Sequence, residues 1–280
     1  MQTITIGSVW NAYRWASGLY RLANTWTEKF SLTQFLIKFV LSRRVSKQSS
    51  KNDTALTLQG ITYIVGLQST EIYTIQELYT DRDYDQINDF IPKYGWTVLD
   101  IGANVGMFAM KQAYCGAYVY AFEPNQDCYR RLSRAIVENK LGSNISALNY
   151  AVGTAPGTGR MRLRDGQTTA GSVVATTSHD ATQDLTVKIT SLDLMIPALT
   201  VTHIDLLKID VEGAEVEVLL GASHTLKLVD RIILEYHSAE LLQQVSATLD
   251  DHGFIQALQV DRDSKACVGV LYAKRTVRPS

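Results

Sequence analysis

The sequence predicts an α/β protein built on a Rossmann-like, doubly wound and mostly parallel seven-stranded sheet. After Trp96, short apolar runs typical of buried strands alternate with amphipathic segments typical of helices. The first apolar run leads into a turn of small residues, VLDIGANVG at 98–106, and then into a helix. This alternation is typical of a parallel sheet, because a helix must return the chain to the starting edge.

The individual elements follow from the same patterning. The last two strands have no helix between them, which predicts an antiparallel hairpin at the end of the chain. Residues 153–186 interrupt the alternation with glycines and period-two patterning, so we expect a β excursion over one edge of the sheet. The expected strands are 98–101, 118–122, 145–151, 204–210, 231–236, 254–260 and 268–273, and the expected helices are 105–114, 125–140, 214–220 and 239–251.

The residues before Trp96 divide into two further segments. Apolar and aromatic residues recur at helical spacing from Val9 to Val45, so residues 1–50 are predicted to form a basic, amphipathic helical extension. Residues 51–95 are predicted to add short strands and a helix near 72–90, packed on the core formed by residues 96–280. The basic helical faces would meet anionic lipid or an acidic partner, or the helices would pack on their own domain.

Composition narrows the functional classes. The chain is 46% hydrophobic and 20% charged, as expected for a globular protein with a sizeable core. The net charge of -1 is unevenly distributed, because residues 1–51 contain eight basic residues and a single acid, Glu28. The rest of the chain is therefore acidic, which disfavours nucleic acid as a substrate. Three cysteines without a CxxC pair indicate neither a disulfide framework nor a zinc site. With no signal-peptide pattern and no apolar run of about 18 residues, we expect a cytoplasmic protein, with the basic helices able to lie at the inner face of a membrane.

The turn after the first strand is the first candidate binding element. Gly102 and Gly106 flank Asn104, and the missing central glycine departs from the GxGxxG pattern of dinucleotide sites. Asp100, an acid just before the turn, disfavours a pyrophosphate and suits a cationic ligand. S-adenosylmethionine carries sulfonium and ammonium charges, so Asp100 is predicted to hold its amino-acid end directly or through water. The alternative is that Asp100 caps the following helix.

Two further residues are expected at the adenosine. Glu123 ends the second strand, 21 residues after Gly102, where a carboxylate can accept hydrogen bonds from both ribose hydroxyls. Dehydrogenases share that feature, so Glu123 indicates adenosine rather than a particular chemistry. Asn149 lies near the end of the third strand, at the level where the adenine ring would lie, and we expect it to contact the base.

Ionisable residues converge on the same edge from the next two strands. Lys208 and Asp210 share one face of their strand, and Glu235 and His237 follow at the neighbouring strand. Methyl transfer to an alcohol requires removal of a proton, so His237, assisted by Asp210 or Glu212, is predicted to be the general base. The alternatives are a structural ion-pair network or a divalent metal held by Asp210, Glu212, Glu235 or His237, and we expect no metal.

Six strings in this order resemble the FkbM family of methyltransferases: DIGANVG within 98–106, FEPN at 122–125, AVG at 151–153, SLD at 191–193, LKIDVEGAE at 207–215 and ILEYH at 233–237. The resemblance implies a class I S-adenosylmethionine-dependent fold, with Asp100, Gly102 and Asn104 in the first loop and Glu123 on the ribose. It also implies O-methylation of sugars or natural products, so we expect a small-molecule, carbohydrate-like acceptor. Residues 1–50 lie outside this resemblance.

Two other classes of function remain open from the sequence. A nicotinamide-dependent oxidoreductase would use Glu123 on a ribose equally well, although the GxGxxG pattern is missing. A docking protein would keep the fold without catalysis and use its basic N-terminal helices on a membrane or a partner.

Overall fold

The central sheet has seven strands, and five of them are parallel. The computed structural model describes residues 16–42, 53–67, 71–163, 183–263 and 267–276. The strand order is β11-β12-β10-β9-β3-β4-β5, and β12 is antiparallel to both of its neighbours. This confirms the predicted sheet and its final hairpin. The bounds are β3 Thr97–Ile101, β4 Tyr118–Phe122, β5 Ile145–Leu148, β9 Leu206–Ile209, β10 Arg231–Tyr236, β11 Phe254–Asp263 and β12 Val268–Arg275.

The sheet is wound in two directions from β3. The chain proceeds from β3 to β4 and β5 on one side, whereas β9 and β10 lie on the other side. The strand order therefore reverses between β3 and β9, and in this architecture the reversal opens a crevice at the carboxyl ends of the strands.

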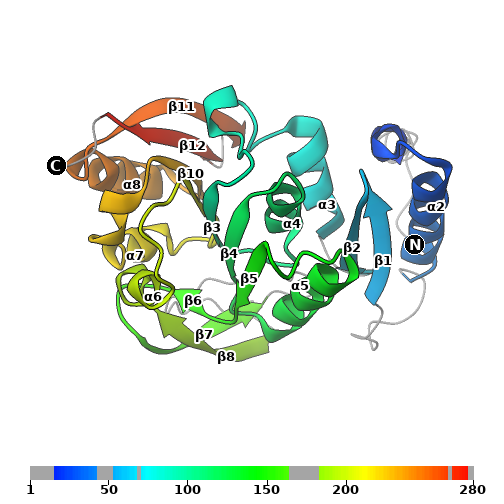
Figure 1. Cartoon of the computed structure of the whole chain (residues 1–280), viewed down its shortest axis with the longest axis horizontal. Helices are drawn as coiled ribbons and strands as arrows, with labels where there is room; N and C mark the ends of the chain where they lie inside the picture. Colours follow the sequence, from blue (N-terminus) through cyan, green and yellow to red (C-terminus); the bar gives the residue numbers. More distant parts are fainter. Residues whose placement is uncertain (1–15, 43–52, 68–70, 164–182, 264–266, 277–280) are drawn as a thin grey trace.

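Helices cover both faces of the sheet (Figure 1). One apolar cluster packs α4 and α5 against residues such as Val98 and Val119, and a second packs α6, α7 and α8 against Leu99 and Ile209. Consecutive residues of β3 thus serve opposite faces, as a strand buried on both sides requires. The bounds are α4 Met107–Tyr114, α5 Gln126–Glu138, α6 Leu192–Ala198, α7 Glu215–Leu220 and α8 Ala239–Asp251. Helix α6 was not predicted, although Ser191 caps it by accepting from the N–H of Leu194.

The β excursion is a separate three-stranded sheet. Strands β7 Gly157–Leu163 and β8 Gln183–Thr190 are antiparallel, and β6 Ala151–Val152 pairs with β8. The predicted strand 145–151 is therefore wrong in extent, because β5 ends at Leu148 and Ala151 belongs to the second sheet. The central part of the excursion, residues 164–182, lies outside the described residues.

Residues before the central sheet form a hairpin and a short helical stretch. Strands β1 Asp53–Leu58 and β2 Ile61–Gly66 are antiparallel, and α3 Glu71–Ile75 continues into a π-helical turn, Gln76–Asp81. Arg82 ends this stretch in the left-handed region at φ 56°. The predicted helix near 72–90 is thus too long, because the chain turns at Arg82 and only a short 3-10 turn follows at Asn88–Phe90.

Two helices precede the hairpin, at residues 16–22 and at α2 Trp26–Ser42. Leu32, Phe35 and Phe39 are buried in the apolar cluster that includes β1 and β2, so one face of α2 packs on the protein itself. The outer parts of the predicted helical extension, residues 1–15 and 43–50, lie outside the described residues. Within the described ranges, no helix is long and apolar enough to cross a bilayer.

Candidate functional site

A cavity of ≈ 190 Å³ opens at the carboxyl ends of the parallel strands, where the strand order reverses. The loop after β3, the ends of β4, β9 and β10, and the segment before the sheet all contribute to its walls. Residues that carry polar groups into it include Asn104, Glu123, Asp210, Glu212, Glu235 and, from the segment before the sheet, Glu77 and Tyr84.

The loop after β3 depends on left-handed backbone at three positions. Gly102 has φ +81°, and a Cβ placed there would lie 1.8 Å from the carbonyl oxygen of Asp210. Asn104 has φ 52°, and Gly106, at φ +83°, precedes α4. A Cβ at Gly106 would lie 2.2 Å from Leu132 Cδ1. Gly102 and Gly106 are therefore required by close packing as well as by backbone conformation.

Glu123 ties this loop to the end of β4. Its Oε2 accepts the backbone N–H of Asn104 at 2.7 Å, and its Oε1 accepts the N–H of Asn125 at 2.7 Å. Each carboxylate oxygen has a further lone pair, so the group can still accept two ligand hydroxyls in the cavity that it lines. Burial raises the pKa of Glu123 to about 7, against the opposing effect of these backbone donors.

Asp100 does not line the cavity. It is fully buried beneath the loop, and its Oδ1 lies 3.1 Å from Lys208 Nζ. The same ammonium lies 3.4 Å from Asp210 and donates to the carbonyl of Gly102 at 3.1 Å. Asp100 is thus outside the cavity lining, and its predicted contact with the amino-acid end of the ligand, directly or through water, stays a prediction. Lys208 thus lies between Asp100 and Asp210 of the cavity lining. Burial raises the pKa of Asp100, and a backbone hydrogen bond from Ala109, in the first turn of α4, is among the effects that lower it, which agrees with the alternative that Asp100 caps this helix.

Asn149 also has a different environment from the one expected. Its Nδ2 donates to the backbone carbonyls of Glu123 at 2.8 Å and Pro124 at 3.2 Å. The next residue, Tyr150, lines the cavity, whereas Asn149 does not. The observed contacts hold the end of β4 in place, and a contact of Asn149 with adenine stays a prediction.

His237 lies among three carboxylates. Its Nδ1 is 3.1 Å from Glu215 Oε1, and its Nε2 is 3.3 Å from Glu212 and 3.7 Å from Glu235. Burial lowers the pKa of His237, but the hydrogen bond to Glu215 and the charges of Glu212 and Asp210 outweigh burial and raise it to about 9. At neutral pH the imidazole is thus protonated and cannot accept a proton, which speaks against the base predicted from the sequence.

Glu212 is the better placed of the predicted catalytic residues. It lines the cavity, and burial together with the charge of Asp210 raises its pKa to about 7, despite the opposing effect of His237. A carboxylate whose pKa lies near the working pH suits general base catalysis. Asp210 also lines the cavity, but Lys208 and His237 hold the pKa of Asp210 below its usual value against the effect of burial.

Sequence reasoning missed Tyr84 and Arg262, which complete the network. The hydroxyl of Tyr84 donates to Glu235 at 3.0 Å, and Arg262 pairs with Glu235 and, at 2.7 Å, with Asp83. Burial raises the pKa of Glu235 to about 8 against the effect of Arg262. Arg262 lies in the polar run of β11, where a charged residue ordinarily faces solvent, so its inward position carried no sequence signal.

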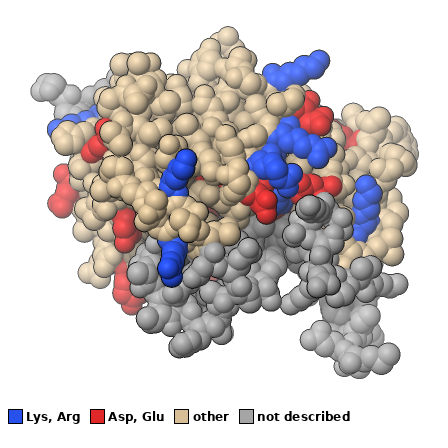
Figure 2. Space-filling model, turned by 90° about the horizontal axis from the view of Figure 1, so that it is seen from below, with Lys and Arg blue, Asp and Glu red and all other residues tan. Residues whose placement is uncertain are grey.

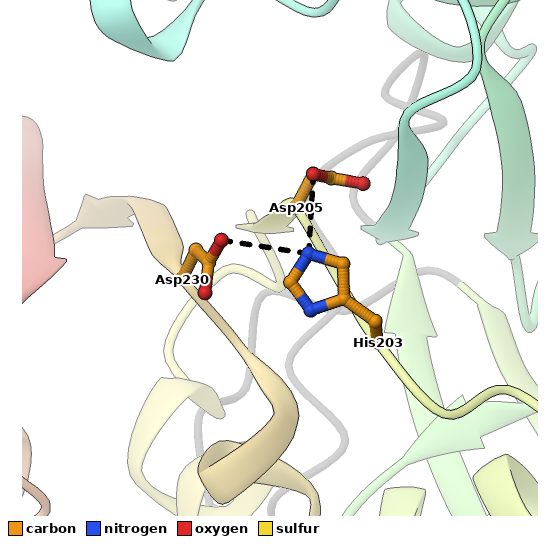
Figure 3. Close-up of side chains that lie close together, drawn as sticks. All are labelled: His203, Asp205 and Asp230. Carbon is orange, nitrogen blue, oxygen red and sulfur yellow. Dashed lines mark hydrogen bonds and ion pairs between the residues drawn. The ribbon is translucent and has the colours of Figure 1, made fainter. Parts of the chain in front are cut away.

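Two groups among the described residues could hold a metal ion. Asp210, Glu235 and His237 form the first, within the network just described. The second lies at the amino ends of the parallel strands, at the other end of the sheet from the cavity. There Asp205 precedes β9 and Asp230 precedes β10 (Figure 3). There His203 Nε2 lies between Asp205 Oδ1, at 3.2 Å, and Asp230 Oδ2, at 3.4 Å. This second group is outside the cavity and takes no part in the candidate site.

Comparison with known proteins places these residues in context. Residues 100–256 match the Methyltransferase FkbM domain family. The chain is 30% identical to Methyltransferase sdnD of Sordaria araneosa, over 65% of this chain and 81% of that protein. It is 26% identical to Hexuronic acid methyltransferase AglP of Haloferax volcanii, over 71% and 80% respectively. A crystal structure of Methyltransferase FkbM from Methylobacillus flagellatus KT matches 95% of this chain and 60% of its own, with 14% identity and a TM-score of 0.48.

Proposed function

Because this chain belongs to the FkbM methyltransferase family, we propose that it transfers a methyl group from S-adenosylmethionine to a hydroxyl oxygen of a sugar, a glycosylated metabolite or another natural product. The observation that carries the proposal is the position of Glu123, a buried carboxylate that faces the cavity beside the loop after β3. The similarity to a hexuronic acid methyltransferase supports a carbohydrate as the acceptor.

The residues of the loop fit the donor. Among the described residues, Asn104 Oδ1 is buried without a hydrogen-bond partner, and an ammonium group of a ligand would satisfy it. Gly102 lets the loop pack directly against the carbonyl of Asp210, and Glu123 retains acceptors for two hydroxyls. When bound, S-adenosylmethionine supplies an electrophilic methyl group whose transfer breaks the carbon–sulfur bond and leaves S-adenosylhomocysteine.

We assign the proton transfer to Glu212. Its carboxylate takes the proton of the acceptor hydroxyl while the oxygen forms its bond to the methyl carbon, so the acceptor gains a methyl group and loses a proton. His237 is a positioning residue in this scheme, because its Nε2 lies 3.3 Å from Glu212 and its charge stabilises the carboxylate form. Lys208 acts in the same way on Asp210.

The test uses the full chain and two readouts. Calorimetric titration with S-adenosylhomocysteine is expected to show binding that Glu123→Ala abolishes. Incubation with methyl-labelled S-adenosylmethionine and a panel of uronic acids, glycosides and natural products is expected to give a product heavier by one methyl group in mass spectrometry. Stabilisation by NADH but not by S-adenosylhomocysteine would reject the donor, and transfer to nitrogen or carbon alone would reject the O-methylation.

A further inference from the structure

Helix α2 has a second apolar face, opposite the one that packs on β1 and β2. Trp26, Phe30, Ile37, Val40 and Leu41 recur at helical spacing, and all five are more than half exposed. Trp26 is 85% exposed and Phe30 65%, so this face lacks a partner among the described residues. We call these five residues the outer face of α2. A contiguous row of large apolar side chains on one helix marks an interaction surface, whereas single exposed ones are ordinary.

The surroundings of the outer face are basic. Residues 16–42 contain Arg21, Lys29 and Lys38, and their one acidic residue, Glu28, is buried. Glu28 is turned inward, where it accepts the backbone N–H groups of Asn24 at 2.6 Å and Gly60 at 2.7 Å. The carboxylate thus fastens α2 to the hairpin, and this part of the surface presents no carboxylate of its own.

A hollow adjoins the outer face. It lies between the helix at residues 16–22 and α2, and its lining includes Tyr20, Leu36, Arg21 and Lys29. This combination of apolar side chains and two cations in one lining is complementary to a ligand with a hydrocarbon chain and an anionic head. In Figure 2, a basic side chain lies at the end of the molecule at which α2 lies in Figure 1, with uncharged residues on its outer side and further basic and acidic side chains on its inner side.

We propose that the outer face of α2 docks this protein on the surface of an anionic lipid bilayer. The helix lies in the interface, with Trp26, Phe30 and Ile37 among the acyl chains and Arg21 and Lys29 at the phosphate groups. A tryptophan at the end of the apolar row suits this depth, since its ring is amphipathic. A second copy of the chain fits less well, because two such faces would bring like charges together without a carboxylate to pair them.

The proposal is independent of the methyl acceptor, and it is tested by vesicle co-sedimentation of the full chain. Vesicles of phosphatidylcholine mixed with phosphatidylglycerol are expected to bind the protein, vesicles of phosphatidylcholine alone to bind it weakly, and added salt to reduce binding. Phe30→Glu is expected to lower the partition coefficient on anionic vesicles by at least about tenfold, from the loss of a buried aromatic side chain. Val137→Glu, which alters an exposed apolar residue on α5, serves as the matched control and is expected to bind like the wild type.

Because both substitutions are at exposed positions, each variant is expected to retain the wild-type unfolding temperature, which shows that it is folded. Absence of binding to anionic vesicles would overturn the proposal, and so would equal binding by Phe30→Glu and the wild type. A dimer in light scattering that Phe30→Glu dissociates, with no vesicle binding, would assign the outer face to a second copy instead. Unaltered S-adenosylhomocysteine affinity in Phe30→Glu is expected, since Phe30 lies outside the cavity.

Discussion

Asn104 donates its backbone N–H to Glu123 Oε2 at 2.7 Å, so one carboxylate sets both the loop after β3 and the ligand acceptors at the end of β4. Glu123→Gln replaces one acceptor oxygen by an amide nitrogen that would face a backbone donor or a ribose hydroxyl. We expect S-adenosylhomocysteine affinity to fall by about tenfold or more, the cost of a charge-assisted hydrogen bond. Calorimetry measures it, with Glu138→Gln on the exposed side of α5 as the control. Equal losses in both variants would refute the specific role of Glu123.

The same carboxylate predicts a proton linkage. In the free protein the pKa of Glu123 is raised to about 7, so the group is partly protonated at neutral pH. Ribose hydroxyls donate to the ionised form and favour it, so binding releases a proton and strengthens as the pH rises through about 7. Calorimetry at neutral pH in buffers of different ionisation enthalpy measures that release. It is expected to fall in Glu123→Gln, and an unchanged release would assign the proton to Glu77 or Glu212, which also line the cavity.

The sequence predicted the central sheet well, because its signals are local. Runs such as residues 98–101 and 231–236 are mostly apolar, as expected for strands buried on both faces, and the structure has strands there. The same locality explains the errors. Asn149 follows Leu148, the last residue of β5, and donates to two backbone carbonyls at the end of β4, a contact between two strand ends that the local sequence does not encode.

The limit of prediction from sequence is clearest for the ionisable residues of the candidate site. The two-residue period of a strand predicts that Lys208 and Asp210 share one face. In the structure they form an ion pair, with Lys208 Nζ 3.4 Å from Asp210 Oδ2. The protonation of His237 depends on Glu215, which lies on a different element, and on distances that no spacing in the sequence encodes. The network around Glu235 likewise depends on Tyr84 and Arg262, which are remote in sequence.

Gly102 is predicted to tolerate no side chain. The Cβ of Gly102→Ala would lie 1.8 Å from the carbonyl oxygen of Asp210, at a φ of +81°. The loop after β9, which begins at Asp210, would have to move away, and the backbone at residue 102 would be strained. We expect this to lower the free energy of unfolding by at least about 2 kcal/mol and to disrupt S-adenosylhomocysteine binding. Gly142→Ala is the control, since its Cβ would meet nothing within 4 Å. Urea unfolding of both variants measures the difference, and wild-type stability of Gly102→Ala would show that the loop is placed otherwise.

His237 is predicted to titrate with a pKa of about 9, and Glu215→Gln to lower that pKa because it replaces the carboxylate beside Nδ1 by a neutral amide. Nuclear magnetic resonance of the histidine rings measures both, with His237→Gln identifying the signal. The raised pKa stabilises the folded state fully below the ordinary value of 6.5, and this contribution is lost as the pH rises through about 9. The loss is about 2 kcal/mol after allowance for partial exposure to solvent. A signal titrating near 6.5 would restore His237 as a candidate base.

Lys208 is predicted to be required because it neutralises Asp100, whose carboxylate is fully buried. Lys208→Met leaves that charge without its cation and is expected to cost about 3–5 kcal/mol of unfolding free energy. Adding Asp100→Asn removes the buried charge, so the double variant is expected to recover most of the loss in urea unfolding. Failure of that rescue would mean that Lys208 acts mainly through the carbonyl of Gly102, to which it donates at 3.1 Å.

The same double variant separates the two roles that Asp100 can have. If Asp100 serves only to hold Lys208 in place, a folded double variant retains a Gly102 loop able to bind S-adenosylhomocysteine, with affinity reduced by about tenfold at most. If the negative charge of Asp100 reaches the ammonium group of the ligand, affinity is lost even though stability returns. We expect the first result, because Asp100 is fully buried and outside the cavity lining, whereas Asn104 lies within it.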